Sequence, residues 1–223
     1  MLQLVIGNKN YSSWSLRPWL AMRHLEIPFE EILIPLDQDD TKTRILAHSP
    51  GGKVPVLKDG DVTVWESLSI LEYLAETFPD RGLWPDDVAA RAHARTVSCE
   101  MHAGFSALRS ACPMNLRKRF AYRDRGSEVT RDVARIQQMW GECRRRFGSE
   151  GPFLFGRFSA ADAMFAPVVA RFETYSIPVD DTVRAYMDAV MGTPAFREWK
   201  AAGDAESWVL AHDEVDEPAL PAE

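Results

Sequence analysis

The sequence predicts a small α/β domain followed by an all-helical domain. Strand-like and helix-like stretches alternate over residues 1–80, whereas strand signals nearly vanish after residue 87. A segment rich in Pro, Gly and Asp separates the two regions. The chain has 223 residues, which suffices for two small domains with a buried core. We therefore expect domains at residues 1–80 and 88–223, joined by a linker at residues 81–87.

The first domain is expected to run strand, helix, strand, connector, hairpin and helix. Pro18 falls in the first turn of the first helix, where its missing N–H costs little. Two β-rich runs flank Asp59 and Gly60, a strong tight-turn signal. The last helix repeats apolar residues on one face. The stretches are Leu2–Ile6, Ser15–Leu25, Phe29–Leu36, residues 53–67 for the hairpin, and Glu66–Phe78.

The second domain is expected to consist of five helices and a tail. Residues 213–223 are acidic and Pro-rich, which predicts a loose tail. The basic run at residues 117–125 is interpreted as a solvated connector. Ser159 and Asp162 are interpreted as a capping box and not as part of a site. The helices are expected at Val88–Ala111, Glu128–Phe147, Ala160–Phe172, Thr182–Met191 and Pro194–Ala205.

Charge and cysteine content exclude several functions. The net charge of −7 argues against a nucleic-acid partner, although helix ends and a few cations could still hold a small anion. Cys99, Cys112 and Cys143 are widely spaced, so we expect neither disulfides nor a zinc site, and we expect a reducing compartment such as the cytoplasm. The sequence shows no signal-peptide pattern and no 18-residue apolar run, so no membrane association is expected.

Three hydroxyls surround Trp14 just after the first strand. One serine suffices to cap the following helix, and Ser15 is the most plausible cap. Ser12 and Ser13 are then left at the open end of a strand–helix turn, where ligands gather in α/β folds. The pattern fits either turn chemistry or a binding site.

Two further motifs allow a binding interpretation. Pro55 is either an edge-strand proline or part of a cis Val54–Pro55 bond that presents the Val54 backbone to an extended ligand. Glu66 and Ser67 either suit the first turn of a helix or form a clamp for an amino-acid head group. In that clamp Glu66 takes the ammonium and Ser67 the carboxylate. With a thiol position near Ser12, the three motifs together describe a bound γ-glutamyl tripeptide.

The sequence resembles the cytosolic glutathione transferases over nearly its whole length. "KVPVL", "ESLSILEYL" and "FSAADAMFAP" match family signatures in order, and "SSWSLR" resembles the serine-type classes. The S-S-x-S pattern resembles the zeta class, which includes maleylacetoacetate isomerases, although Trp14 replaces the usual cysteine. The resemblance implies a thioredoxin-like glutathione-binding domain before the helical domain, a cytoplasmic homodimer acting in detoxification, glutathione as cosubstrate and no metal.

The resemblance also implies roles for individual residues. Ser12 is the candidate that activates the glutathione thiol, with Ser13 and Tyr11 as alternatives. A serine in place of cysteine makes thiol–disulfide reductase activity unexpected. Arg17 is either structural or tunes the local field. The residues carried over for glutathione binding are Lys53, Val54, Glu66 and Ser67.

A small apolar electrophile is expected as second substrate, held between the domains. Its candidate contacts lie at helical spacing, although the same residues could pack in the core or in a dimer interface: Met101, His102, Phe105 and Arg109. The function expected is glutathione transfer to this electrophile. The alternatives are a glutathione-dependent isomerase of the maleylacetoacetate type and a non-catalytic binding module.

Overall fold

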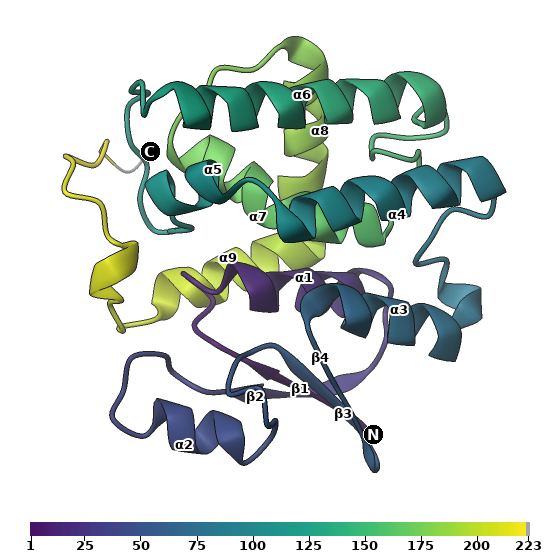
Figure 1. Ribbon diagram of the computed structural model, residues 1–223, viewed down its shortest axis with the longest axis vertical. Helices are drawn as coiled ribbons and strands as arrows, with labels where there is room; N and C mark the ends of the chain where they lie inside the picture. The colour runs from purple at the N-terminus through teal and green to yellow at the C-terminus, as the bar shows by residue number, and fades with distance from the viewer. Residues whose placement is uncertain (222–223) are drawn as a thin grey trace.

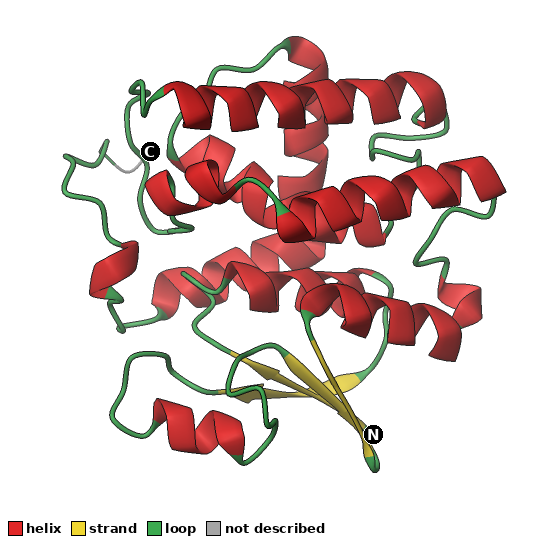
Figure 2. Cartoon of the chain, in the orientation of Figure 1, coloured by secondary structure: helices red, strands yellow, loops and turns green. Residues whose placement is uncertain are grey.

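The computed structural model describes residues 1–221 and contains a mixed sheet with helices on both faces. The strand order is β2-β1-β3-β4, in which β1 pairs parallel to β2 and antiparallel to β3. Figure 2 shows the strands gathered at one end of the molecule and helices filling the rest. The elements are β1 (Leu2–Ile6), α1 (Ser13–His24), β2 (Phe29–Leu33), α2 (Thr41–Leu46), β3 (Val56–Asp59), β4 (Val62–Trp65) and α3 (Ser67–Thr77).

Alternation along β1 determines what each face of the sheet contacts. Leu4 and Ile6 belong to the large core beneath α1 and α3, whereas Val5 belongs to a small separate cluster with Ile45 of α2. Helices α1 and α3 therefore lie between the sheet and the helical domain, and α2 covers the other face (Figure 1).

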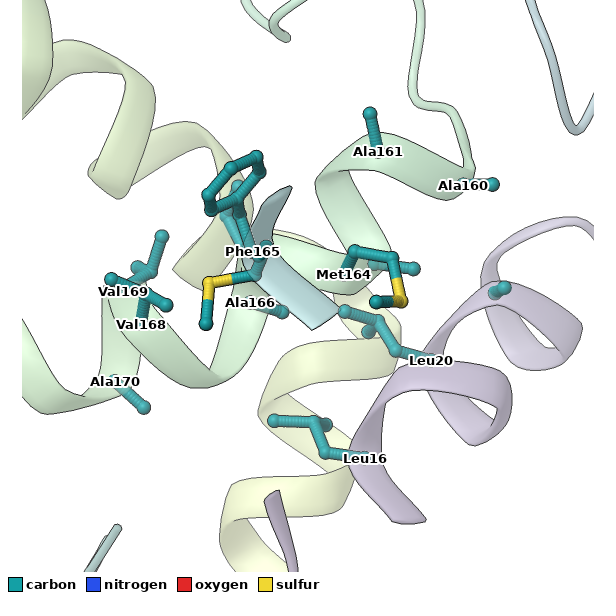
Figure 3. Close-up of a cluster of buried hydrophobic side chains, with 14 of the residues drawn as sticks. Leu16, Leu20, Ala160, Ala161, Met164, Phe165, Ala166, Val168, Val169 and Ala170 are labelled. Atoms are coloured by element: carbon teal, nitrogen blue, oxygen red, sulfur yellow. The ribbon is translucent and has the colours of Figure 1, made fainter. Parts of the chain in front are cut away.

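The helical domain is built around one buried helix, α7 (Ala160–Thr174). Every residue of α7 except Glu173 is buried. Figure 3 shows Leu20 of α1 beside Met164 of α7, with Leu16 further along α1. No described helix is long and apolar enough to cross a membrane. The other helices are η1 (Pro79–Arg81), α4 (Val88–Ala103), α5 (Ser106–Ala111), α6 (Ser127–Phe147), α8 (Asp181–Met191), α9 (Pro194–Ala205) and η2 (Ala211–Asp213).

The predicted fold class is confirmed, with local differences, one of which is that β2 ends at Leu33 and not at Leu36. Helix α2 lies in the expected connector, where a single buried residue, Ile45, gave no periodic signal. The helix expected over 88–111 is broken at Gly104 and Phe105, and Phe105 has a left-handed φ of 61°. Helix α1 begins at Ser13, two residues earlier than expected.

The acidic tail is not loose, contrary to expectation. Residues 206–220, here called the C-terminal strap, are held by the basic run at 117–125. Lys118 pairs with Glu214, and Arg125 donates to Glu217 at 2.8 Å. The Leu220 N–H donates to a main-chain carbonyl of the basic run. Figure 1 shows this yellow segment along one side of the molecule. The last two residues of the predicted tail, 222–223, lie outside the described part of the chain.

The Ser159–Asp162 capping box is present at the start of α7. Asp162 is fully buried and accepts from the Ser159 backbone N–H at 2.8 Å, the Ser159 hydroxyl at 2.9 Å and the Leu154 N–H at 3.0 Å. Burial raises the pKa of Asp162 to about 6, and these hydrogen bonds oppose the rise. The carboxylate therefore organises the loop before α7.

We expect Asp162→Ala to lower the free energy of unfolding by about 3 kcal/mol, because each buried donor left without an acceptor costs about 1–3 kcal/mol. Chemical denaturation followed by circular dichroism measures the change. The matched control is Asp181→Ala, which removes an exposed acid from the first turn of α8 and should cost less than about 1 kcal/mol. Equal losses in the two variants would contradict the role assigned to Asp162.

Candidate active site

Two adjoining cavities lie where the domains meet. The larger has a volume of about 880 Å³, and the smaller about 360 Å³. Both are lined by Trp14, Lys53, Val54 and Arg109. The turn before α1, the loop around α2, helix α5, Arg171 of α7 and the C-terminal strap complete the larger one. Its volume is in the range of small-molecule sites.

The serine hydroxyls are arranged differently from the expected helix cap. Ser12 lines the larger cavity, and its hydroxyl donates to the buried Ser15 Oγ at 2.8 Å. Ser15 Oγ also accepts from the Gly7 N–H at 3.1 Å, so it ties the helix start to the end of β1. Ser15 lies inside the first turn of α1 and is not its N-cap, which corrects the sequence interpretation. The Ser12 hydroxyl is therefore hydrogen-bonded to the Ser15 hydroxyl, which the Gly7 N–H holds in position.

Tyr11 and Ser13 also line the larger cavity, but their oxygen atoms have other partners. The Tyr11 hydroxyl donates to Glu214 of the C-terminal strap at 2.5 Å and accepts from Arg117 at 2.7 Å. Burial and the hydrogen bond to Glu214 raise the pKa of Tyr11. Ser13 Oγ accepts from Arg171 Nη2 at 3.4 Å. Tyr11 therefore holds the strap in place.

Glu66 and Ser67 meet in the smaller cavity, at the N-terminus of α3. Glu66 has a left-handed φ of 67°, a conformation that is costly for a residue with a side chain and is common at ligand sites. Its exposed carboxylate lies 3.7 Å from His102 Nε2. The buried Ser67 hydroxyl accepts from Arg17 Nη1 at 3.5 Å. An anionic acceptor and a helix N-terminus thus lie side by side.

Lys53 and Val54 line both cavities. Of the two alternatives for Pro55, the structure has the cis Val54–Pro55 bond. The glutathione-binding residues carried over from the resemblance are therefore grouped around the smaller cavity and its junction with the larger one.

Arg17, Arg109 and Arg171 form a cationic cluster around Trp14 and Ser13. Within residues 1–221, no carboxylate oxygen lies within 4.0 Å of a nitrogen of these three guanidinium groups. The Arg17 and Arg109 guanidinium carbons lie 4.1 and 4.5 Å from the centre of the Trp14 ring. Burial, with Arg171 and Arg109 adding to it, lowers the pKa of Arg17 well below its usual value. Three guanidinium groups are therefore gathered here, and no carboxylate of the described residues is bound directly to any of them.

Only one of the four candidate second-substrate residues lines these cavities. That residue is Arg109. Met101 and Phe105 pack in the hydrophobic core. His102 lies edge-on to Trp14 at 5.2 Å, and burial followed by the charge of Arg17 lowers its pKa. The sequence interpretation missed Arg171, whose only local signal is a cation within a mostly apolar helix.

Two protein-family descriptions match most of the chain. "Glutathione S-transferase, N-terminal domain" matches residues 11–77, and "Glutathione S-transferase, C-terminal domain" matches residues 126–202. The maleylacetoacetate isomerase of Pseudomonas aeruginosa is 26% identical over 219 residues, covering 92% of this chain and 99% of that protein.

A probable maleylacetoacetate isomerase of Caenorhabditis elegans is 38% identical over 97 residues, which span only 43% of this chain and 44% of that protein. Among solved structures, a Burkholderia glutathione transferase homologue with bound glutathione has a TM-score of 0.68 and 22% identity. That match covers 92% of this chain and 99% of that one. It shows that the fold is shared.

We expect Glu214→Ala to loosen the C-terminal strap. Glu214 accepts hydrogen bonds from Tyr11, Asn115 and Lys118. A hydrogen bond to a charged group contributes about 1.5–3 kcal/mol, so opening of the strap should become at least tenfold more frequent. Hydrogen exchange of peptides covering residues 206–220, read by mass spectrometry, measures this. Asp216→Ala, which removes an exposed acid of the same segment, is the matched control; equal exchange in both variants would disprove the anchoring role.

Proposed function

The chain belongs to the glutathione S-transferase family, and we propose that it activates the glutathione thiol as a thiolate for attack on a small electrophile. The observation that carries this proposal is the Ser12 hydroxyl. Ser12 lines a cavity that adjoins the Glu66–Ser67 clamp, and its hydroxyl is hydrogen-bonded to Ser15. Glutathione binding followed by turnover of a panel of electrophiles tests it.

We place glutathione across both cavities. Glu66 takes the α-ammonium group, and the Ser67 hydroxyl and backbone N–H take the α-carboxylate at the positive end of α3. Arg17, 3.5 Å from the Ser67 oxygen, adds favourable charge for that carboxylate. Val54 pairs with the cysteinyl backbone, with Lys53 beside it. The Burkholderia homologue of the same fold has bound glutathione, which supports glutathione as the ligand.

The magnitudes suffice for thiolate formation. A free cysteine thiol has a pKa of about 8.5, and lowering it by two units requires roughly 2.7 kcal/mol. A hydrogen bond from a hydroxyl to a charged group supplies about 1.5–3 kcal/mol. The N-terminus of α1 adds about 0.3–1 kcal/mol. Ser12 acts as a donor and needs no histidine or aspartate to deprotonate it.

The Ser12–Ser15 hydrogen bond explains the number of hydroxyls in the turn. When the thiolate is present, Ser12 turns its proton toward sulfur, and Ser15 donates its own proton to Ser12. Ser15 is held in position by the Gly7 N–H, at 3.1 Å. Ser15 is thus a positioning residue that keeps the donor aligned.

An isomerase of the maleylacetoacetate type is the second candidate, favoured by the names of the two curated relatives. It uses the same thiolate, but it releases glutathione unchanged. Including a cis-dienone acid in the electrophile panel separates it from a transferase, because the isomerase consumes no glutathione. A non-catalytic binding module would bind glutathione without turnover. We also propose that the protein is a cytoplasmic homodimer.

We expect Glu66→Ala to weaken glutathione binding about tenfold, because the ammonium loses a charged partner worth about 1–2 kcal/mol. Isothermal titration calorimetry gives the affinity. Glu76→Ala, an exposed glutamate on the same helix, is the matched control and should bind like wild type. Unchanged affinity in Glu66→Ala would remove Glu66 from the clamp.

We expect Ser12→Ala to raise the pKa of bound glutathione by at least one unit with little change in its affinity. Conjugation at neutral pH should then fall at least tenfold, since one unit corresponds to about 1.4 kcal/mol. Higher pH should restore much of the rate. Ultraviolet absorbance of the thiolate, titrated on the bound tripeptide, reads the pKa directly.

Ser13→Ala is the control for this experiment and should leave the titration near wild type. If the pKa of bound glutathione shifts in Ser13→Ala but not in Ser12→Ala, the hydrogen-bond donor is Ser13. If neither variant shifts the titration, a backbone amide or Tyr11 is the donor.

A further inference from the structure

Arg171 is a buried cation with unused hydrogen-bonding capacity at the larger cavity. Its guanidinium has five N–H donors. It donates to the carbonyls of Cys112 at 2.8 Å and Pro167 at 3.4 Å, and to Ser13 Oγ at 3.4 Å. All three acceptors are neutral. Arg171 also lines the larger cavity, so its remaining donors have access to a ligand there.

Arg109 completes a second side of the same region. Its Nη1 donates to the carbonyls of Gly104 at 3.2 Å and His102 at 3.4 Å, again neutral acceptors. Within residues 1–221 its Nε and Nη2 atoms make no hydrogen bond. The stacking on Trp14 holds the guanidinium plane at the wall of the cavity.

Within residues 1–221 no acid forms an ion pair with these cations, although Asp37, Asp39 and Asp213 also line the larger cavity. Asp37 is engaged by His212 at 3.0 Å. Asp213 acts on Arg171 only from beyond 4.0 Å. Burial, and then the charge of Arg109, lowers the pKa of Arg171 to about 10, so it stays protonated at neutral pH. Burying like charges without a counter-ion is unfavourable, and an anionic ligand would relieve that cost.

We propose that Arg109, Arg171 and the Ser13 hydroxyl form a subsite for a carboxylate of the second substrate, next to the glutathione thiol. The inference rests on the proposed function, and it corrects the expectation of a purely apolar electrophile. The carboxylate accepts from both guanidinium groups, while Trp14 and Met114 contact the apolar body. Arg171 lines only the larger cavity, whereas Arg109 lines both, so Arg171 distinguishes this subsite from the glutathione clamp.

A matched pair of electrophiles tests the subsite: 4-chloro-3-nitrobenzoate and its neutral isostere 4-chloro-3-nitrobenzamide. In both, the thiolate attacks the carbon bearing chlorine, a C–S bond forms, and chloride leaves with the C–Cl bonding pair. Each kcat/KM is divided by the uncatalysed rate to remove intrinsic reactivity. We expect wild type to prefer the acid at least tenfold. Arg171→Met and Arg109→Gln should abolish this preference, and Arg171→Lys should keep part of it.

Calorimetry on the glutathione-loaded protein gives a readout that does not need turnover. Wild type should bind 3-nitrobenzoate at least tenfold more tightly than 3-nitrobenzamide, and Arg109→Gln should bind both equally. Arg109 is partly exposed, so this variant decides the matter if Arg171→Met does not fold.

Other outcomes overturn the inference. Equal handling of acid and amide by wild type that still binds glutathione would do so while leaving the proposed function intact. If an arginine variant loses kcat/KM on both electrophiles and also shifts the pKa of the bound glutathione thiol, the arginines act on the thiol and not on a substrate carboxylate. A tenfold loss of glutathione affinity in Arg109→Gln would place Arg109 in the glutathione clamp. Wild type that binds no glutathione would instead reject the proposed function itself.

Discussion

The packing of α1 against α7 is the contact on which the site depends. Leu16 and Leu20 pack against α7, and Arg17 Nε donates to the Met164 carbonyl at 3.1 Å. This contact fixes the N-terminal turn of α1 relative to Arg171, although 158 residues separate Ser13 and Arg171. It also crosses between the two domains. The hydroxyl groups come from one domain, and both arginines that line the larger cavity come from the other, so this cavity exists only when both domains are folded and docked.

Much of the fold could be predicted because its signals are local. The Asp59-Gly60 turn, the apolar run Leu2–Ile6 and the Ser159–Asp162 capping box each lie within a few residues and correspond to observed elements. Helix α2 could not be predicted in this way, because one buried residue in six leaves no periodicity. The same holds for the candidate site. Local motifs contain four of its residues, namely Ser12, Val54, Glu66 and Ser67. Arg171 could not be predicted, because only tertiary packing brings it to the cavity.

The C-terminal strap shows why charge runs are hard to interpret from sequence. From sequence, the basic run at 117–125 and the acidic segment at 213–223 are each expected to be solvated. In the structure their opposite charges pair with one another. Ion pairs on an open surface contribute little, about 0–1 kcal/mol. Here the Tyr11–Glu214–Asn115 contacts are partly buried, and they bring Leu210 and Asp213 to the wall of the larger cavity. The chain end thereby becomes part of the site.

The stability of the fold does not by itself account for the presence of three arginines in this region. Replacing buried charges with apolar side chains of similar size is often neutral or stabilising, so folding does not require three unpaired cations around Trp14. Two of them have separate tasks in the proposed complex. Arg17 lies beside Ser67, where the α-carboxylate of glutathione would bind, and Arg171 lies beside Ser13, where a second anion would bind. Trp14 stands between these positions as the common wall of both cavities. A side chain of that size would separate the two proposed anions, and its ring stacks with Arg17 and Arg109. The smaller cysteine of the zeta-like motif could do neither.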